Sequence, residues 1–193
     1  MNIPAIRSAT EAERAKVIDL ITLAFAADPL ARWCLPDVDR YLRIMPRWID
    51  AFAGSGLARG ATFVSDGLEG AAMWLPPGVG PDLEAMMRII DESADERVPE
   101  LLSVLEQMSR FHPGEPCWYL PLIGVDPMMQ GRGFGGMLMR HAAARCDAEG
   151  MTAYLESSSP RNMALYLRHG FEVMGTIQAG SSPVLTPMVR YPR

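Results

Sequence analysis

The sequence predicts one α/β domain over residues 1–193, in which helices pack on a mixed central sheet. From Trp118 onwards strand patterns alternate with helix patterns and end as two adjacent strands, which is the order of a mixed sheet. Two amphipathic helix patterns are inserted before the fourth strand pattern. No repeat or low-complexity linker divides the chain, whose 193 residues suit a single hydrophobic core.

The composition is that of a globular domain, and it argues against several other classes of protein. Hydrophobic residues make up 49% of the chain and charged residues 21%, as in ordinary globular domains. With a net charge of -5 the chain has no basic field for a phosphate backbone, so we expect no nucleic acid partner. Three scattered cysteines and three scattered histidines predict neither a disulfide framework nor a metal site. Charges in the first thirty residues, and the lack of a run of about 18 apolar residues, predict a cytoplasmic protein without a signal peptide or membrane span.

The chain opens with a strand and a helix. A short strand is predicted over residues 3–8, and Thr10 with Glu13 forms a capping box that starts the helix. Apolar residues recur at helical spacing as far as Phe25, and Asp28-Pro29 is expected to end this helix.

A second helix and a hairpin follow. Apolar residues at positions 41–52 share one helical face, although Pro46 is expected to kink or delay that helix. Asp66-Gly67 is a turn signal between the strand patterns 61–65 and 70–75.

The rest of the chain contains the inserted helices and the alternating part. Glycine and proline mark most of the boundaries. The predicted elements are helices at 83–90 and 98–105, a strand at 118–125, a helix at 134–149, a strand at 153–156, a helix at 160–170, and closing strands at 171–178 and 184–190.

A glycine-rich turn lies between the buried strand and the helix that follows it. Residues 130–136 read Gln-Gly-Arg-Gly-Phe-Gly-Gly. The unpaired N–H groups and the positive end of a helix N-terminus favour an anion. Glycine lets the backbone approach that anion closely and adopt positive φ. With Arg132 as an added cation, the turn predicts a phosphate-binding site.

Two other phosphate-binding patterns also use a glycine-rich turn. Gly131, Gly133 and Gly136 fit G-x-G-x-x-G, with Glu156 as a later carboxylate, so a dinucleotide-dependent enzyme is an alternative. However, residues 126–130 separate the strand from the first glycine, and the chain after Gly136 is short for a six-stranded nucleotide-binding sheet. A P-loop is excluded because no Gly-Lys-Ser or Gly-Lys-Thr follows.

Residues 125–135 resemble the acetyl-CoA motif of the GNAT family of N-acetyltransferases. Gln130, Gly133 and Gly135 match its pattern of Gln or Arg, two residues, Gly, one residue, and Gly or Ala. Asn162, Tyr166 and Gly170-Phe171 match the second cofactor segment. Within the family, residues 118–120 and 156–171 are most similar to puromycin N-acetyltransferase and its bacterial relatives.

The resemblance implies the GNAT-type acyl-CoA N-acyltransferase fold, with a helical insert before the fourth strand. The strand that ends at Val125 would splay from its neighbour near Glu156 and leave a cleft for the pantetheine arm, paired as in strand addition. The residues that would bind acetyl-CoA are Ile123, Val125, Gln130, Gly131, Arg132, Gly133, Gly135, Gly136 and Asn162.

The resemblance also implies catalytic residues. Tyr166 would protonate the departing thiolate, whereas without the resemblance it reads as a packing residue. An ammonium must lose a proton before it can attack, and Glu156 is the first candidate base. His112, Glu115 or a water chain are alternatives. Residues expected to wall the acceptor side, as suits a hydrophobic amine, are Asp28, Trp33, Tyr41 and Trp74.

The sequence therefore predicts an acetyl-CoA-dependent N-acetyltransferase that acts on a primary amine of a small molecule. The amine would attack directly, without an acetyl-enzyme and without a metal. We expect a monomer or homodimer with no nucleic acid or membrane partner. The alternatives are the dinucleotide-dependent enzyme and a non-catalytic acyl-CoA-binding sensor.

Overall fold

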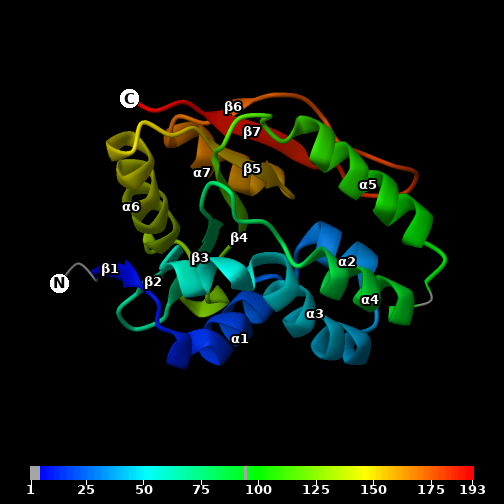
Figure 1. The fold of residues 1–193 in the computed structure, drawn as a ribbon. Helices are drawn as coiled ribbons and strands as arrows, with labels where there is room; N and C mark the ends of the chain where they lie inside the picture. Colours follow the sequence, from blue (N-terminus) through cyan, green and yellow to red (C-terminus); the bar gives the residue numbers. More distant parts are fainter. Residues whose placement is uncertain (1–4, 94) are drawn as a thin grey trace.

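A seven-stranded mixed sheet forms the centre of the computed structural model, which describes residues 5–93 and 95–193 (Figure 1). The strand order is β1-β2-β3-β4-β5-β7-β6. The pair β4–β5 is parallel and the other pairs are antiparallel. The strands are β1 Ile6–Ser8, β2 Thr62–Ser65, β3 Gly70–Leu75, β4 Trp118–Val125, β5 Ala153–Ser157, β6 Glu172–Val173 and β7 Thr186–Arg190.

Helices cover both faces of this sheet (Figure 1). The pair α4 and α5 lies between β3 and β4 in the chain, which confirms the predicted insert before the fourth strand. The α-helices are α1 Arg14–Ala24, α2 Pro29–Cys34, α3 Val38–Ala53, α4 Leu83–Ser93, α5 Val98–Phe111, α6 Phe134–Ala148 and α7 Pro160–Arg168. Short 3-10 turns are η1 Glu11–Glu13, η2 Gly54–Arg59 and η3 Pro127–Met129.

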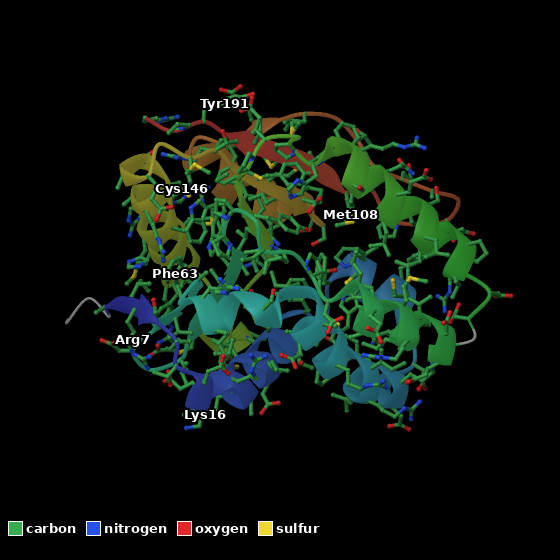
Figure 2. The ribbon with its side chains drawn as sticks, in the orientation of Figure 1. Arg7, Lys16, Phe63, Met108, Cys146 and Tyr191 are labelled. Atoms are coloured by element: carbon green, nitrogen blue, oxygen red, sulfur yellow. The ribbon has the colours of Figure 1, made fainter. Side chains whose placement is uncertain are left out.

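Alternating side chains of the central strands make two cores. In β2, Phe63 packs toward α6 in a cluster that includes Leu138 and Cys146 (Phe63 and Cys146 are labelled in Figure 2). The next residue, Val64, packs on the opposite face with Ile21 of α1 and Ile49 of α3. This alternation is the two-residue period of a strand buried on both sides. The mixed sheet with helices on both faces agrees with the predicted fold class.

Local signals explain where several elements begin. The capping box of Thr10 and Glu13 forms as predicted, with the Thr10 N–H donating to Glu13 Oε2 at 2.9 Å. It opens the short turn η1, which continues into α1. Helix α3 passes through Pro46 without interruption. The predicted part of the first strand at Ile3 and Pro4 lies outside the described residues.

The predicted end of the first helix was wrong. Helix α1 ends at Ala24, and Asp28 is instead the N-cap of α2, where its Oδ1 accepts from the N–H groups of Leu30 and Ala31 at 3.0 Å each. Pro29 occupies the first turn, where its missing N–H costs no hydrogen bond. An Asp-Pro pair thus starts a helix here.

The predicted strand over residues 171–178 was too long. Only Glu172–Val173 forms β6, and the chain then leaves the sheet, rejoining it through a bridge between Ile177 and Leu185. Gly175 passes close to α5, because a Cβ at that position would lie 2.8 Å from the Phe111 ring. Beyond β6 the chain therefore passes beside the end of α5.

The two parallel strands separate part-way along. Pairing between β4 and β5 runs from Trp118 opposite Ala153 to Leu120 opposite Leu155. Beyond Leu120, β4 continues to Val125 with β3 as its partner on the other side. The strands therefore splay at the position that the family resemblance implied. Among the described residues, no helix is long and apolar enough to cross a membrane.

Candidate active site

A cleft of about 630 Å³ opens where β4 and β5 separate. The end of β4, the glycine-rich turn with the start of α6, and one face of α7 form its walls. The predicted cofactor residues that line it are Ile123, Val125, Gln130, Gly131, Gly133, Gly135, Gly136 and Asn162. Arg132 is exposed on the turn and is not among the lining residues.

The glycine-rich turn has the backbone geometry that an anion cradle requires. Gly131 and Gly133 have φ of +77° and +91°, in the left-handed region that favours glycine. A Cβ at either position would meet no atom within 4 Å, so these residues border open space. Gly133 is also the N-cap of α6, whose first-turn N–H groups have no partner within the helix. The turn can therefore offer several donors to one anion.

Side-chain contacts hold this turn in place. Gln130 Nε2 donates to the Val125 carbonyl at 3.3 Å, which ties the turn to the end of β4. On the α7 side, His169 Nε2 lies 3.2 Å from the Gly136 carbonyl and Nδ1 lies 2.8 Å from that of Leu165. The start of α6 is thus linked both to β4 and to α7.

Helix α7 presents one face to the cleft. Ser159 caps the helix, so Asn162 lies in its first turn and Tyr166 one turn later, and both line the cleft. Tyr166 is buried and packs its ring on Phe171, with 6.2 Å between the ring centroids. Burial, with the charge of Asp28, raises the pKa of the Tyr166 hydroxyl, which therefore stays protonated at neutral pH.

Two arginines of α7 also line the cleft and were not identified from the sequence. Arg161 and Arg168 are seven residues apart, on the helix face that also carries Leu165. This i, i+4, i+7 spacing was the available signal. They place positive charge beside a cleft suited to an anion.

A second cavity, of about 150 Å³, adjoins the cleft and extends between β4 and the helices α2 to α5. Phe25, Asp28, Ile123, Asn162 and Tyr166 line both hollows, so these residues mark the junction. Two of the predicted acceptor residues, Asp28 and Trp33, line this cavity. Met108 of α5, labelled in Figure 2, also lines it.

Two predicted acceptor residues belong to the core instead. Trp74 is 1% exposed and packs edge-on against Trp118, with ring centroids 6.4 Å apart. Tyr41 is also buried, and its hydroxyl donates to the Thr22 carbonyl at 2.6 Å. Neither residue lines the cleft or the cavity. The placement of both on the acceptor side was wrong, because β3 and α3 turn these aromatic rings inward.

Glu156 lines the cavity at the end of β5. The Tyr119 hydroxyl donates to its Oε2 at 2.8 Å. Desolvation outweighs this hydrogen bond and raises the pKa of Glu156 to about 7. A carboxyl group that titrates near neutrality can accept a proton from a ligand and release it again.

The alternative bases lie elsewhere. His112 is exposed, and its ring packs edge-on against Tyr119 and Tyr154 at centroid distances of 5.3 and 5.1 Å. Glu115 is exposed in the loop before β4. Neither residue lines the cleft or the cavity. Among the described residues, no group of three or more His, Cys, Asp or Glu side chains is placed to hold a metal ion.

Comparisons with known proteins agree with this fold. Residues 90–171 match the sequence profile of the Acetyltransferase (GNAT) family. An uncharacterised N-acetyltransferase of Schizosaccharomyces pombe is 24% identical over 163 residues, covering 77% of this chain and 66% of the relative. The chain therefore spans just under two thirds of the length of that curated relative.

Solved structures give the same result over almost the whole chain. One is a Corynebacterium glutamicum protein described as histone acetyltransferase HPA2 and related acetyltransferase. It has a TM-score of 0.74 and 26% identity, and the match covers 98% of this chain and 97% of that protein. Polyamine N-acetyltransferase of Drosophila melanogaster has a TM-score of 0.65 and 18% identity, with 98% and 100% coverage. Together with the splayed strands and the glycine-rich turn, these matches confirm the resemblance: residues 90–171 match the GNAT family of N-acetyltransferases, and the chain has the fold of acetyltransferases of that family.

Proposed function

We propose that this protein transfers the acetyl group of acetyl-CoA to a primary amine of a small molecule. One observation carries the proposal. A cleft with a phosphate-suited turn and an unpaired strand edge meets a mostly apolar cavity at Tyr166 and Asp28. The cleft suits a long, phosphorylated donor, and the cavity suits an acceptor. The two reactants would meet at the junction.

The donor would lie along the cleft. Backbone N–H groups of Gly131, Gly133, Gly135 and Gly136 would hold the pyrophosphate of acetyl-CoA, with Arg132 at the rim and Gln130 keeping the turn closed. Main-chain groups of Ile123 and Val125 would pair with the amides of the pantetheine arm, because β4 has no β5 partner beyond Leu120. Asn162 would contact the donor at the junction.

The reaction needs two proton transfers, and Glu156 in the cavity and Tyr166 at the junction offer one group for each. Glu156 would take a proton from the bound ammonium, which leaves a lone pair on nitrogen to attack the thioester carbonyl carbon. As the carbon–sulfur bond breaks, Tyr166 would give its proton to the sulfur. The products are an N-acetylated amine and coenzyme A.

Direct attack fits the cysteine chemistry of the cavity. Cys34 lines the cavity, but burial raises the pKa of its thiol to about 12. A thiolate rather than a thiol is the nucleophile, so Cys34 is poorly suited to carry the acetyl group. The Drosophila relative, which forms N-acetylagmatine, has the same fold and supports a small amine as the acceptor class. The likeness to puromycin N-acetyltransferase stays a prediction.

A turnover assay tests the proposal. Purified protein with acetyl-CoA and a panel of primary amines should release coenzyme A thiol in step with an N-acetylated product detected by mass. The same protein with Gly133→Glu should lose this activity, because the new carboxylate would occupy the pyrophosphate site and repel the pyrophosphate. Gly150→Glu is the matched control, since Gly150 also has positive φ and open surroundings but lies at the other end of α6.

The outcomes separate the alternatives. Acetyl-CoA binding without thiol release from any amine would favour the acyl-CoA sensor. Binding of NAD instead of acetyl-CoA would favour the dinucleotide-dependent enzyme. Equal loss of activity in both glycine variants would contradict the assignment of the phosphate cradle.

A further inference from the structure

The cavity beside the cleft is apolar along most of its length. Helices α2 to α5 and strand β4 supply its walls, and aliphatic and aromatic side chains dominate. Helix α5 contributes Leu101, Val104, Leu105 and Met108 to these walls. The α4–α5 insert therefore builds a large part of the wall of this cavity.

The volume of the cavity limits what can fill it. At about 150 Å³ it matches the size of an apolar cavity that binds one benzene molecule. One aromatic ring, or an alkyl chain of about six carbons, fills such a space. A larger group would have to remain partly outside, in the cleft or in solvent.

Two carboxylates line the cavity. Asp28 is at the junction, and its Oδ2 accepts a hydrogen bond from the Ser158 hydroxyl. Glu156, near the end of β5, is two residues before Ser158, and both residues line the cavity. An ammonium group beside this segment would face two acidic groups while its apolar substituent contacts the side chains of α5.

The remaining charged groups in the wall are already paired. Asp95 accepts from Arg97 at 2.9 Å and forms an ion pair with Arg40 at 3.3 Å. Arg97 also donates to the Trp33 carbonyl and lies over the Trp33 ring, 6.0 Å from its centroid. A second ammonium deep in the cavity would have to break this network or stay desolvated, and both are costly.

On the basis of the proposed function, we infer that the acceptor is a primary monoamine whose apolar substituent is about one aromatic ring or six carbons in size. The ammonium binds between Asp28 and Glu156, and the apolar group fills the cavity under α5. Amines with a second charge at the far end of the chain are excluded. The α4–α5 insert thereby determines the acceptor specificity.

A pair of amines that differ in one group tests this inference. Hexylamine and hexamethylenediamine have the same carbon chain, and only the diamine carries a distal ammonium. We expect kcat/KM for hexylamine and for phenethylamine to exceed that for the diamine by at least about tenfold. Equal values for hexylamine and the diamine would overturn the inference.

A cavity-filling variant locates the binding site. Leu101→Trp should raise the KM for hexylamine by about tenfold or more, while the Kd for acetyl-CoA stays within about twofold. Leu102→Trp is the matched control, because Leu102 is the next residue of α5 but is 39% exposed and lines neither hollow. An unchanged KM in folded Leu101→Trp would overturn the inference.

Two further readouts keep this test separate from that of the proposed function. Calorimetric titration with hexylamine and with the diamine, without acetyl-CoA, measures occupation of the cavity even if no acetyl transfer occurs. Tighter binding of hexylamine supports the inference in that case. If Leu101→Trp instead impairs the use of hexanoyl-CoA and leaves the amine KM unchanged, the cavity holds the acyl chain of the donor and the inference is wrong.

Discussion

The position of Tyr166 fits one chemical step, the transfer of a proton to the leaving sulfur. Its ring is buried against Phe171, and the residue lines both the cleft and the cavity. Its hydroxyl stays protonated at neutral pH because burial raises its pKa. The ring serves packing, and only the hydroxyl can serve proton transfer.

Tyr166→Phe separates these two roles. The variant keeps the ring, so the melting temperature and acetyl-CoA affinity should stay close to those of the wild type. Turnover should fall by about a hundredfold if the hydroxyl protonates the leaving sulfur. Steady-state kinetics with calorimetry measures both quantities. A fall of less than about threefold would return Tyr166 to a packing role.

The Tyr119 and Glu156 pair predicts a measurable pH dependence. Activity should rise with pH through the pKa of Glu156, about 7, because the base must be ionised. The Tyr119 hydroxyl stabilises the ionised carboxylate, so Tyr119→Phe raises that pKa further. The midpoint of the kcat/KM profile should then move about 1 pH unit toward the alkaline side.

Two variants control this experiment. Glu156→Gln should remove the acidic limb together with most of the activity. Tyr41→Phe removes a hydroxyl that donates to the Thr22 carbonyl and lines neither hollow, so it should leave the midpoint unchanged. A Tyr119→Phe profile with the midpoint of the wild type would show that a group other than Glu156 sets the acidic limb.

Sequence patterns predicted the helices and strands whose ends are set by residues close together in the chain. The continuous apolar run of β4 and the glycine boundaries of α6 gave both elements to within one residue of their ends. The sequence did not predict helix α2, because Asp28-Pro29 indicates the end of a helix as well as the start of one, through Asp at the N-cap followed by Pro. The strand β6 is shorter than predicted, and just beyond it the chain passes close to α5, which is distant in sequence.

The two parts of the candidate site, the cleft and the cavity, differ in the same way in how well the sequence predicts them. The cleft residues lie in two short segments with a recognisable motif, and nearly all of them line the observed cleft. The cavity beside the cleft is assembled from α2, α3, α4, α5 and β4, and its lining residues look like ordinary core residues in each helix. For this reason Leu101 and Met108 carried no functional signal in the sequence, while buried Trp74 suggested a role that it does not have.

For the whole molecule, the splay between β4 and β5 separates two packed units. Strands β1 to β4 belong to one antiparallel group, and β5, β7 and β6 to another. Three parallel residue pairs join the groups, from Trp118 opposite Ala153 to Leu120 opposite Leu155. A ligand in the cleft would contact β4 of the first group and α7, the helix that follows β5, since residues of both line it.

Ligand binding should therefore stabilise the whole fold, and the choice of ligand is informative. Acetyl-CoA at about 100 times its Kd should stabilise the folded state by about 2.7 kcal/mol and raise the melting temperature by about 5–10 °C. NAD should leave the melting temperature unchanged, because a dinucleotide site needs a largely parallel sheet, whereas among the described strands only β4 and β5 are parallel. Scanning calorimetry with each ligand measures both shifts. A rise with NAD and none with acetyl-CoA would contradict the donor assignment, while the fold and its splayed strands would stand.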